Sequence, residues 1–217
     1  QTQIDMGAPA SKCLVIPNGI QYERFCDIPL KPEDGWVDIG AVVRLAPIKD
    51  VKTLIHAFSE LSNRVDNVRL HILGGVDDQD YADECYELVK QLEVKNLEFT
   101  GRVNVVEYMR KLDFTVLSVL ESFAAARPCV TTDVGCCREL LEGEEGDDLG
   151  VAGFYVPPMY REGLARAMER MCASRKLREA MGQVGRERVK TYYRHERMLD
   201  EYRALYLDTA ERYGLEH

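Results

Sequence analysis

Short apolar runs alternate along this chain with longer amphipathic stretches. The runs that have the composition of buried strands are Cys13–Ile16, Val37–Val43, Val68–Leu73, Leu97–Phe99, Phe114–Leu117, Cys129–Thr132 and Phe154–Val156. Several are bounded by Gly or Pro, which mark turns. Continuous apolar runs are typical of parallel strands that are covered on both faces. The alternation therefore predicts an α/β fold, a Rossmann-like parallel sheet flanked by helices.

The stretches between these runs carry the periodicity of helices that are apolar on one face. The expected helices are Asp50–Leu61, Asp80–Leu92, Leu164–Met171, Arg178–Val189 and His195–Tyr213. A further helix-like stretch, Ser118–Ala126, follows a strand almost directly. The last three residues, Leu215, Glu216 and His217, resemble the remnant of an expression tag. We therefore expect residues 1–214 to form one domain.

Charge and cysteine content exclude several classes of protein. The chain of 217 residues has 28 Lys and Arg against 37 Asp and Glu, a formal net charge of −9. Nucleic-acid binding is not expected, because phosphate backbones favour broad basic surfaces. The apolar runs are too short to span a membrane. The seven cysteines are scattered without C-x-x-C spacing, which favours a reduced, cytoplasmic protein.

Two cations stand five residues apart on a turn between a strand and a helix. Arg44 offers a planar fork to phosphate oxygens, and Lys49 offers a compact point charge. The amino end of the following helix adds its positive dipole. This arrangement suits a diphosphate. The alternative is that both cations are simply solvated in a loop.

Three further segments are candidates for ligand contact. Glu121 ends a Ser-x-x-Glu sequence, which predicts a helix capping box. Its carboxylate could instead accept hydrogen bonds from ribose hydroxyls. The turns Gly74-Gly75 and Gly101-Arg102-Val103 each follow a strand, and glycine allows a ligand to approach the backbone closely. Taken alone, each glycine signal is weak, and an ordinary turn is the simpler interpretation of both.

One connection is unusually short. Leu117 ends an expected strand and Ser118 begins a helix-like stretch, whereas such connections normally take about 2–6 residues. Ligands bind at this edge of open parallel sheets, so a missing loop would remove part of a site. We expect that residues are missing from the sequence at this point. A Cα separation well above about 3.8 Å would confirm this, and a normal peptide bond would refute it.

Taken together, these segments resemble family 4 glycosyltransferases of the GT-B fold. The resemblance rests on Pro17-Asn18-Gly19-Ile20, Val43-Arg44-Leu-Ala-Pro-Ile-Lys49-Asp50, Leu73-Gly74-Gly75, Phe99-Thr-Gly101-Arg102-Val103 and the stretch from Glu121 to Gly135. It covers residues 7–206 and only the family's carboxyl-terminal, donor-binding half. The segments 47–53 and 132–140 look closest to the branch that serves bacterial Pel exopolysaccharide synthesis.

The resemblance implies roles for individual residues. Arg44 and Lys49 would bind the donor diphosphate, and Glu121, as the second of the family's paired glutamates, would contact the ribose. Gly74 and the turn Gly101-Arg102-Val103 would border the nucleobase. The first glutamate of the pair, eight positions earlier in the family, lies in a loop that is absent here. No residue of this chain is therefore assigned as catalytic.

The same resemblance implies a reaction. The chain would be the donor half of a retaining transferase that moves a hexose, glucose from UDP-glucose, to a growing exopolysaccharide. Because the two cations can neutralise the leaving diphosphate, we expect neither a metal nor a cofactor. The expected partners are the missing amino-terminal domain, which carries the acceptor site, and the exopolysaccharide machinery at the inner membrane. The isolated domain is expected to be inactive.

Two alternatives come from other classes of protein. The chain could be a non-catalytic domain that binds a nucleotide or a partner and has lost the glutamate loop. It could also be a nucleotide-sugar epimerase, but no G-x-G-x-x-G sequence lies near the first strand.

Overall fold

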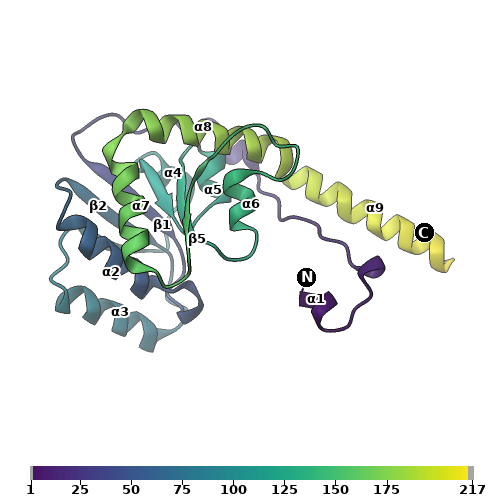
Figure 1. Cartoon of the computed structure of the whole chain (residues 1–217), viewed down its shortest axis with the longest axis horizontal. Helices are drawn as coiled ribbons and strands as arrows, with labels where there is room; N and C mark the ends of the chain where they lie inside the picture. The colour runs from purple at the N-terminus through teal and green to yellow at the C-terminus, as the bar shows by residue number, and fades with distance from the viewer. Residues whose placement is uncertain (1, 215–217) are drawn as a thin grey trace.

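The computed structural model describes residues 2–214, and its centre is a single six-stranded sheet (Figure 1). The strands are β1 (Val37–Val42), β2 (Val68–Leu73), β3 (Leu97–Gly101), β4 (Phe114–Val116), β5 (Cys129–Thr132) and β6 (Gly153–Val156). Their order is β3-β2-β1-β4-β5-β6, and every pairing is parallel. The predicted α/β class is confirmed, as are six of the seven expected strands.

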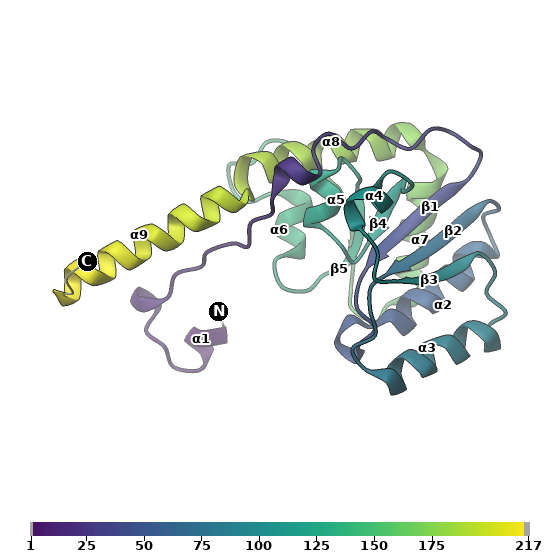
Figure 2. The same cartoon turned by 180° about the vertical axis from the view of Figure 1, so that it is seen from behind.

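Helices cover both faces of the sheet. They are α1 (Thr2–Asp5), α2 (Val51–Ser62), α3 (Gln79–Gln91), α4 (Val105–Met109), α5 (Leu120–Ala124), α6 (Cys137–Glu142), α7 (Arg161–Ala173), α8 (Arg175–Tyr192) and α9 (His195–Tyr213). Apolar residues of α2, α3 and α7 form one core with the sheet, and those of α4, α5, α6 and α8 form a second core on the other face (Figures 1 and 2). Burial on both faces explains why the strands read as continuous apolar runs.

The expected strand Cys13–Ile16 is not formed. The segment is extended, but the side chains of Leu14 and Val15 are 63% and 79% exposed. In Figure 2 it runs away from the sheet, on the same side of the molecule as α9. A strand needs a neighbouring backbone for its hydrogen bonds, and no described residue pairs with this segment. Local apolar composition was therefore insufficient to make a strand here.

Backbone hydrogen bonds attach the amino-terminal segment to the start of α9. The N–H of Ile20 donates to the carbonyl of Tyr193 at 2.9 Å, and the N–H of His195 donates to the carbonyl of Ile20 at 2.9 Å. A Cβ on Gly19 would lie 2.5 Å from the carbonyl oxygen of Arg194, so this close crossing requires glycine. The Asn18-Gly19 turn is thus used to bring two distant parts of the chain together.

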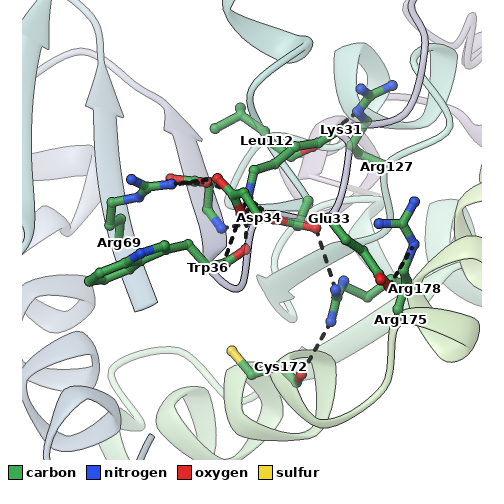
Figure 3. A network of polar contacts seen from close by, with 12 residues as sticks. Lys31, Glu33, Asp34, Trp36, Arg69, Leu112, Arg127, Cys172, Arg175 and Arg178 are labelled. Carbon is green, nitrogen blue, oxygen red and sulfur yellow. Dashed lines mark hydrogen bonds and ion pairs between the residues drawn. The ribbon is translucent and has the colours of Figure 1, made fainter. Parts of the chain in front are cut away.

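A network of buried charges lies at the amino ends of β1 and β4 (Figure 3). Lys31 Nζ lies 2.6 Å from Asp38 Oδ2 and 3.2 Å from Asp113 Oδ2, and all three side chains are less than a tenth exposed. Asp113 Oδ1 in turn lies 3.4 Å from Arg178 of α8. The ion pairs join the segment before β1, two central strands and a helix. The apolar pattern of the chain does not predict these ion pairs.

Asp38 is the most heavily bonded carboxylate of this network. It accepts hydrogen bonds from Arg69 Nε at 2.6 Å and from Lys31, and His71 Nε2 lies 2.8 Å away. Burial alone would raise the pKa of Asp38, but the bonds from His71, Arg69 and Lys31 outweigh it and hold the pKa well below the ordinary value of 3.8. The ionised form therefore stabilises the folded state.

This downward shift of the Asp38 pKa predicts acid sensitivity. Its contribution to stability is complete above the ordinary aspartate range and is lost as the pH falls below about 4. We expect the free energy of unfolding to drop by on the order of 1–2 kcal/mol between pH 5 and pH 2.5 because of this group. Urea unfolding at a series of pH values measures it. Asp38→Asn should flatten the pH dependence, whereas Asp66→Asn, at an exposed site, should leave it unchanged; equal slopes in both variants would contradict the assignment.

Candidate functional site

The order of the strands places the candidate site at the carboxyl end of β1. From β1 the chain proceeds to β2 and β3 on one side, and β4, β5 and β6 follow on the other. The direction in which successive strands are added to the sheet therefore reverses between β1 and β4. In open α/β sheets, ligands bind outside the carboxyl ends of the strands at such a reversal.

A hollow of about 330 Å³ opens at the carboxyl ends of β1 and β2. Four of the residues predicted for donor binding line it: Arg44, Gly74, Arg102 and Val103. Its remaining walls are aliphatic and consist of Val42, Val43, Leu73 and Val105. An aliphatic hollow with cations on its rim can accept a flat, uncharged ring and an anionic group attached to it. Lys49, Gly101 and Glu121 lie outside its lining.

Glycine allows the turns after β1 and β2 to pack against each other. A Cβ on Gly74 would lie 2.0 Å from the carbonyl oxygen of Val43, so no larger residue fits without moving the backbone. Beyond this contact the two turns remain paired, because the N–H of Leu45 donates to the carbonyl of Gly75 at 3.0 Å. Arg102 packs over Gly75, where a Cβ would lie 2.7 Å from its Nε. Gly74 thus shapes the hollow as well as lining it.

Gly101 forms the turn at the carboxyl end of β3. It ends β3 with φ of +67°, in the left-handed region, and its carbonyl accepts a hydrogen bond from the N–H of Gly74 at 3.0 Å. The residue turns the chain from β3 into the Arg102-Val103 wall. The prediction of a close turn is confirmed, while contact with a nucleobase stays a prediction.

The two predicted phosphate-binding cations differ in their surroundings. Arg44 is 63% exposed and forms an ion pair with Asp77, from the turn after β2. Lys49 ends a 3₁₀ turn, Pro47–Lys49, and is exposed; its N–H donates to the Ala46 carbonyl, but within residues 2–214 its ammonium group has no hydrogen-bond or ion-pair partner. Asp50, with φ of +45°, connects this turn to α2. Lys49 is therefore available to an anion, whereas Arg44 is already paired.

The connection from β4 to α5 consists of residues 117–119, and the expectation that residues are omitted there stays a prediction. Leu117 makes the turn in a left-handed conformation with φ of +63°. The Ser118 hydroxyl then accepts a hydrogen bond from the N–H of Val42 at 2.7 Å and lies 3.2 Å from the Val42 carbonyl oxygen. Ser118 thereby bridges β1 and β4 at the reversal of the sheet. A side-chain hydroxyl substitutes there for the backbone bonds of a longer strand.

Glu121 does not form the predicted capping box. The helix begins at Leu120 with Val119 as its N-cap, and no side chain caps it, because the Ser118 hydroxyl is bonded to β1 instead. The Glu121 side chain is half-buried, and among the described residues it has no hydrogen-bond or ion-pair partner. The helix-like stretch 118–126 shortens to Leu120–Ala124, and at its far end Ala126 leaves the helix with φ of +57°. A carboxylate without a partner at this edge remains compatible with ribose binding.

An Asp-x-Asp sequence, the element of metal-dependent transferases, occurs at Asp78-Gln79-Asp80. Asp78 caps α3, since its Oδ1 accepts a hydrogen bond from the N–H of Tyr81 at 2.9 Å. No group of three or more His, Cys, Asp or Glu residues in the part of the chain that the structure describes could hold a metal ion. The spacing of the two aspartates is explained by the start of a helix.

Asp77 and Ser118 are the residues of this edge whose roles the sequence did not reveal. Asp77 stands two residues beyond Gly75, in a turn that carries several acids, and only the packing of the two turns brings it to Arg44. The Ser-x-x-Glu pattern predicts a helix cap at Ser118, and the structure uses this side chain to join two strands instead.

None of the described helices is long and apolar enough to cross a membrane.

A protein family and several curated relatives match most of this chain. The family described as "Glycosyl transferases group 1" matches residues 28–188. The capsular polysaccharide biosynthesis glycosyltransferase CapM of Staphylococcus aureus is 26% identical over 207 residues, covering 87% of this chain and 52% of CapM. The chain thus spans about half the length of the curated relatives that it matches.

Solved structures show the same fold. Anabaena HepE in complex with UDP and glucose superimposes with a TM-score of 0.77 at 19% identity, over 93% of this chain and 58% of HepE. The C-terminal domain of the group 1 glycosyl transferase LpcC from Francisella tularensis has a TM-score of 0.63 at 22% identity, over 82% of this chain and 95% of that domain. With the family match over residues 28–188, these findings show that the chain belongs to the group 1 glycosyltransferases.

Proposed function

We propose that this chain is the donor-binding half of a retaining, metal-independent glycosyltransferase. The observation that carries the proposal is the placement of Arg44 and Lys49, with an aliphatic hollow between strand ends, at the reversal point of a parallel sheet. The donor is a UDP-sugar and the transferred group a hexose, glucose in the first instance. The acceptor is a growing bacterial exopolysaccharide, of the Pel type.

Each residue of the site has a role in this proposal. Lys49 and Arg44 bind the diphosphate and stabilise the charge that develops on it as the bond to the sugar breaks. The Glu121 carboxylate accepts hydrogen bonds from the ribose. The nucleobase enters the hollow between Gly74 and the Gly101-Arg102-Val103 turn. No cofactor takes part, since the cations supply the charge stabilisation.

The proposed partners follow from length and from relatives. The chain covers 58% of HepE, whose structure contains UDP and glucose, and 52% of CapM, named for capsular polysaccharide biosynthesis. A GT-B enzyme needs a second domain for its acceptor, so we propose that an amino-terminal domain completes the site. The complete enzyme would work in the cytoplasm, beside the exopolysaccharide machinery of the inner membrane.

Titration calorimetry with UDP tests the donor site. We expect saturable binding that is tighter for UDP than for ADP or GDP. Lys49→Ala should weaken UDP binding about tenfold or more, because a hydrogen bond to a charged group contributes about 1.5–3 kcal/mol.

The matched control is Lys95→Ala. Lys95 is an exposed lysine that precedes β3, at the opposite edge of the sheet. It carries the same charge far from the site, so its replacement should leave UDP affinity unchanged. Equal losses in both variants would remove Lys49 from the site, and tighter binding of ADP or GDP would change the donor.

A second candidate function is favoured by Ser118. Because its hydroxyl bridges β1 and β4, it occupies the place where the family's glutamate loop would begin. A domain that has closed this crevice could bind a nucleotide or a protein partner without catalysis. The absence of saturable binding for all three nucleotides would favour partner binding over the donor site.

The Ser118 bridge is tested by stability. Ser118→Ala removes the hydroxyl that accepts from the half-buried N–H of Val42, so we expect the free energy of unfolding to fall by about 1–2 kcal/mol. Urea unfolding measures the change. Ser62→Ala, which removes a half-buried hydroxyl bonded to its own helix, should change stability much less. A loss at Ser118 no larger than the loss at Ser62 would show that the bridge does not hold β1 to β4.

A further inference from the structure

We propose that Asp77 competes with the donor's diphosphate for the Arg44 guanidinium. Asp77 would be a positioning residue that weakens the binding of the nucleoside diphosphate and recaptures Arg44 when that product leaves. The inference rests on the proposed function, since it concerns the same phosphate-binding cations.

Arg44 and Asp77 form an ion pair at the surface of the protein. Arg44 Nη1 contacts Asp77 Oδ2, and the two side chains are 63% and 31% exposed. An incoming anion therefore reaches the guanidinium without opening the fold. Lys52, in the first turn of α2, also pairs with a carboxylate, that of Glu84. Of the two cations proposed to bind the diphosphate, however, only Arg44 contacts a carboxylate of the described residues, whereas the Lys49 ammonium contacts none. Competition for the proposed diphosphate site thus falls on Arg44.

The backbone holds Asp77 in this position. Its N–H and that of Asp78 both donate to the carbonyl of Leu45 at 3.2 Å, so the acid is attached to the residue directly after Arg44. On one side Gly74 packs against Val43, and on the other Asp78 caps α3. Asp77 is therefore fixed at both ends of its turn, and its contact with Arg44 is not an accident of a free loop.

The negative charge of Asp77 opposes the binding of a diphosphate to Arg44. A guanidinium binds one oxyanion best through two parallel hydrogen bonds. A diphosphate that binds Arg44 in this way must therefore displace Asp77 or share the guanidinium with it. A carboxylate that stays beside the phosphates also repels them. Since the ion pair is exposed, its displacement costs little, and the expected penalty on affinity is modest.

Calorimetric titration of four variants with UDP tests the inference. Asp77→Asn should tighten UDP binding about two- to fivefold relative to the unaltered chain, the range expected for an exposed ion pair. In the Arg44→Ala background the same substitution should give no such gain, because the competitor has lost its target. The control Asp80→Asn removes one negative charge from the adjacent first turn of α3 and measures the general effect of charge.

Each outcome of these titrations either supports or overturns the competition between Asp77 and the diphosphate. A gain at Asp77 that exceeds the gain at Asp80 and requires Arg44 supports the competition. A loss of affinity would show that Asp77 orients Arg44 toward the phosphate, and an equal gain with and without Arg44 would show a general field effect; either overturns the inference while leaving the donor site intact. If neither the unaltered chain nor Asp77→Asn binds UDP, the proposed function itself fails.

Discussion

Parallel pairing around β1 is the constraint on which the rest of this structure depends. Because all strands run in one direction, every crossover returns the chain to the same edge, and the turns that follow β1, β2 and β3 meet there. Reversal of the strand order between β1 and β4 then leaves this edge as the place for a ligand. Arg44, Gly74 and Arg102 are far apart in sequence, yet this topology alone brings them to one hollow.

The two edges of the sheet use charge in opposite ways. At the amino ends, Lys31, Asp38 and Asp113 are buried, and they neutralise one another where an unpaired charge would be costly. At the carboxyl ends, Arg44 and Lys49 are exposed, and the one ion pair of Arg44 is weak enough to be exchanged for a ligand. The first arrangement holds the domain together, and the second leaves cations available for an anion.

Predictions from sequence succeeded where local pattern and tertiary environment agree. β5 and α9 have the predicted bounds. The continuous apolar run of β5 is buried, and α9 begins after the extended Arg194 and ends at Gly214, which has φ of +60°. Cys13–Ile16 has the composition of a strand but lacks a neighbouring backbone, and it remains unpaired. The capping box at Ser118 failed for a related reason: the hydroxyl accepts a hydrogen bond from the N–H of Val42 on β1, so it is not available to cap the helix.

The sequence by itself determined the fold class, the turns after the strands and the family resemblance, because periodicity and glycine positions are local properties of the chain. Only the tertiary structure decided which charged side chains meet. Lys31 with Asp113, Arg44 with Asp77 and Ser118 with Val42 are each separated by more than thirty residues. Such contacts depend on how the strands are ordered and how closely their turns approach, and no local pattern encodes these distances.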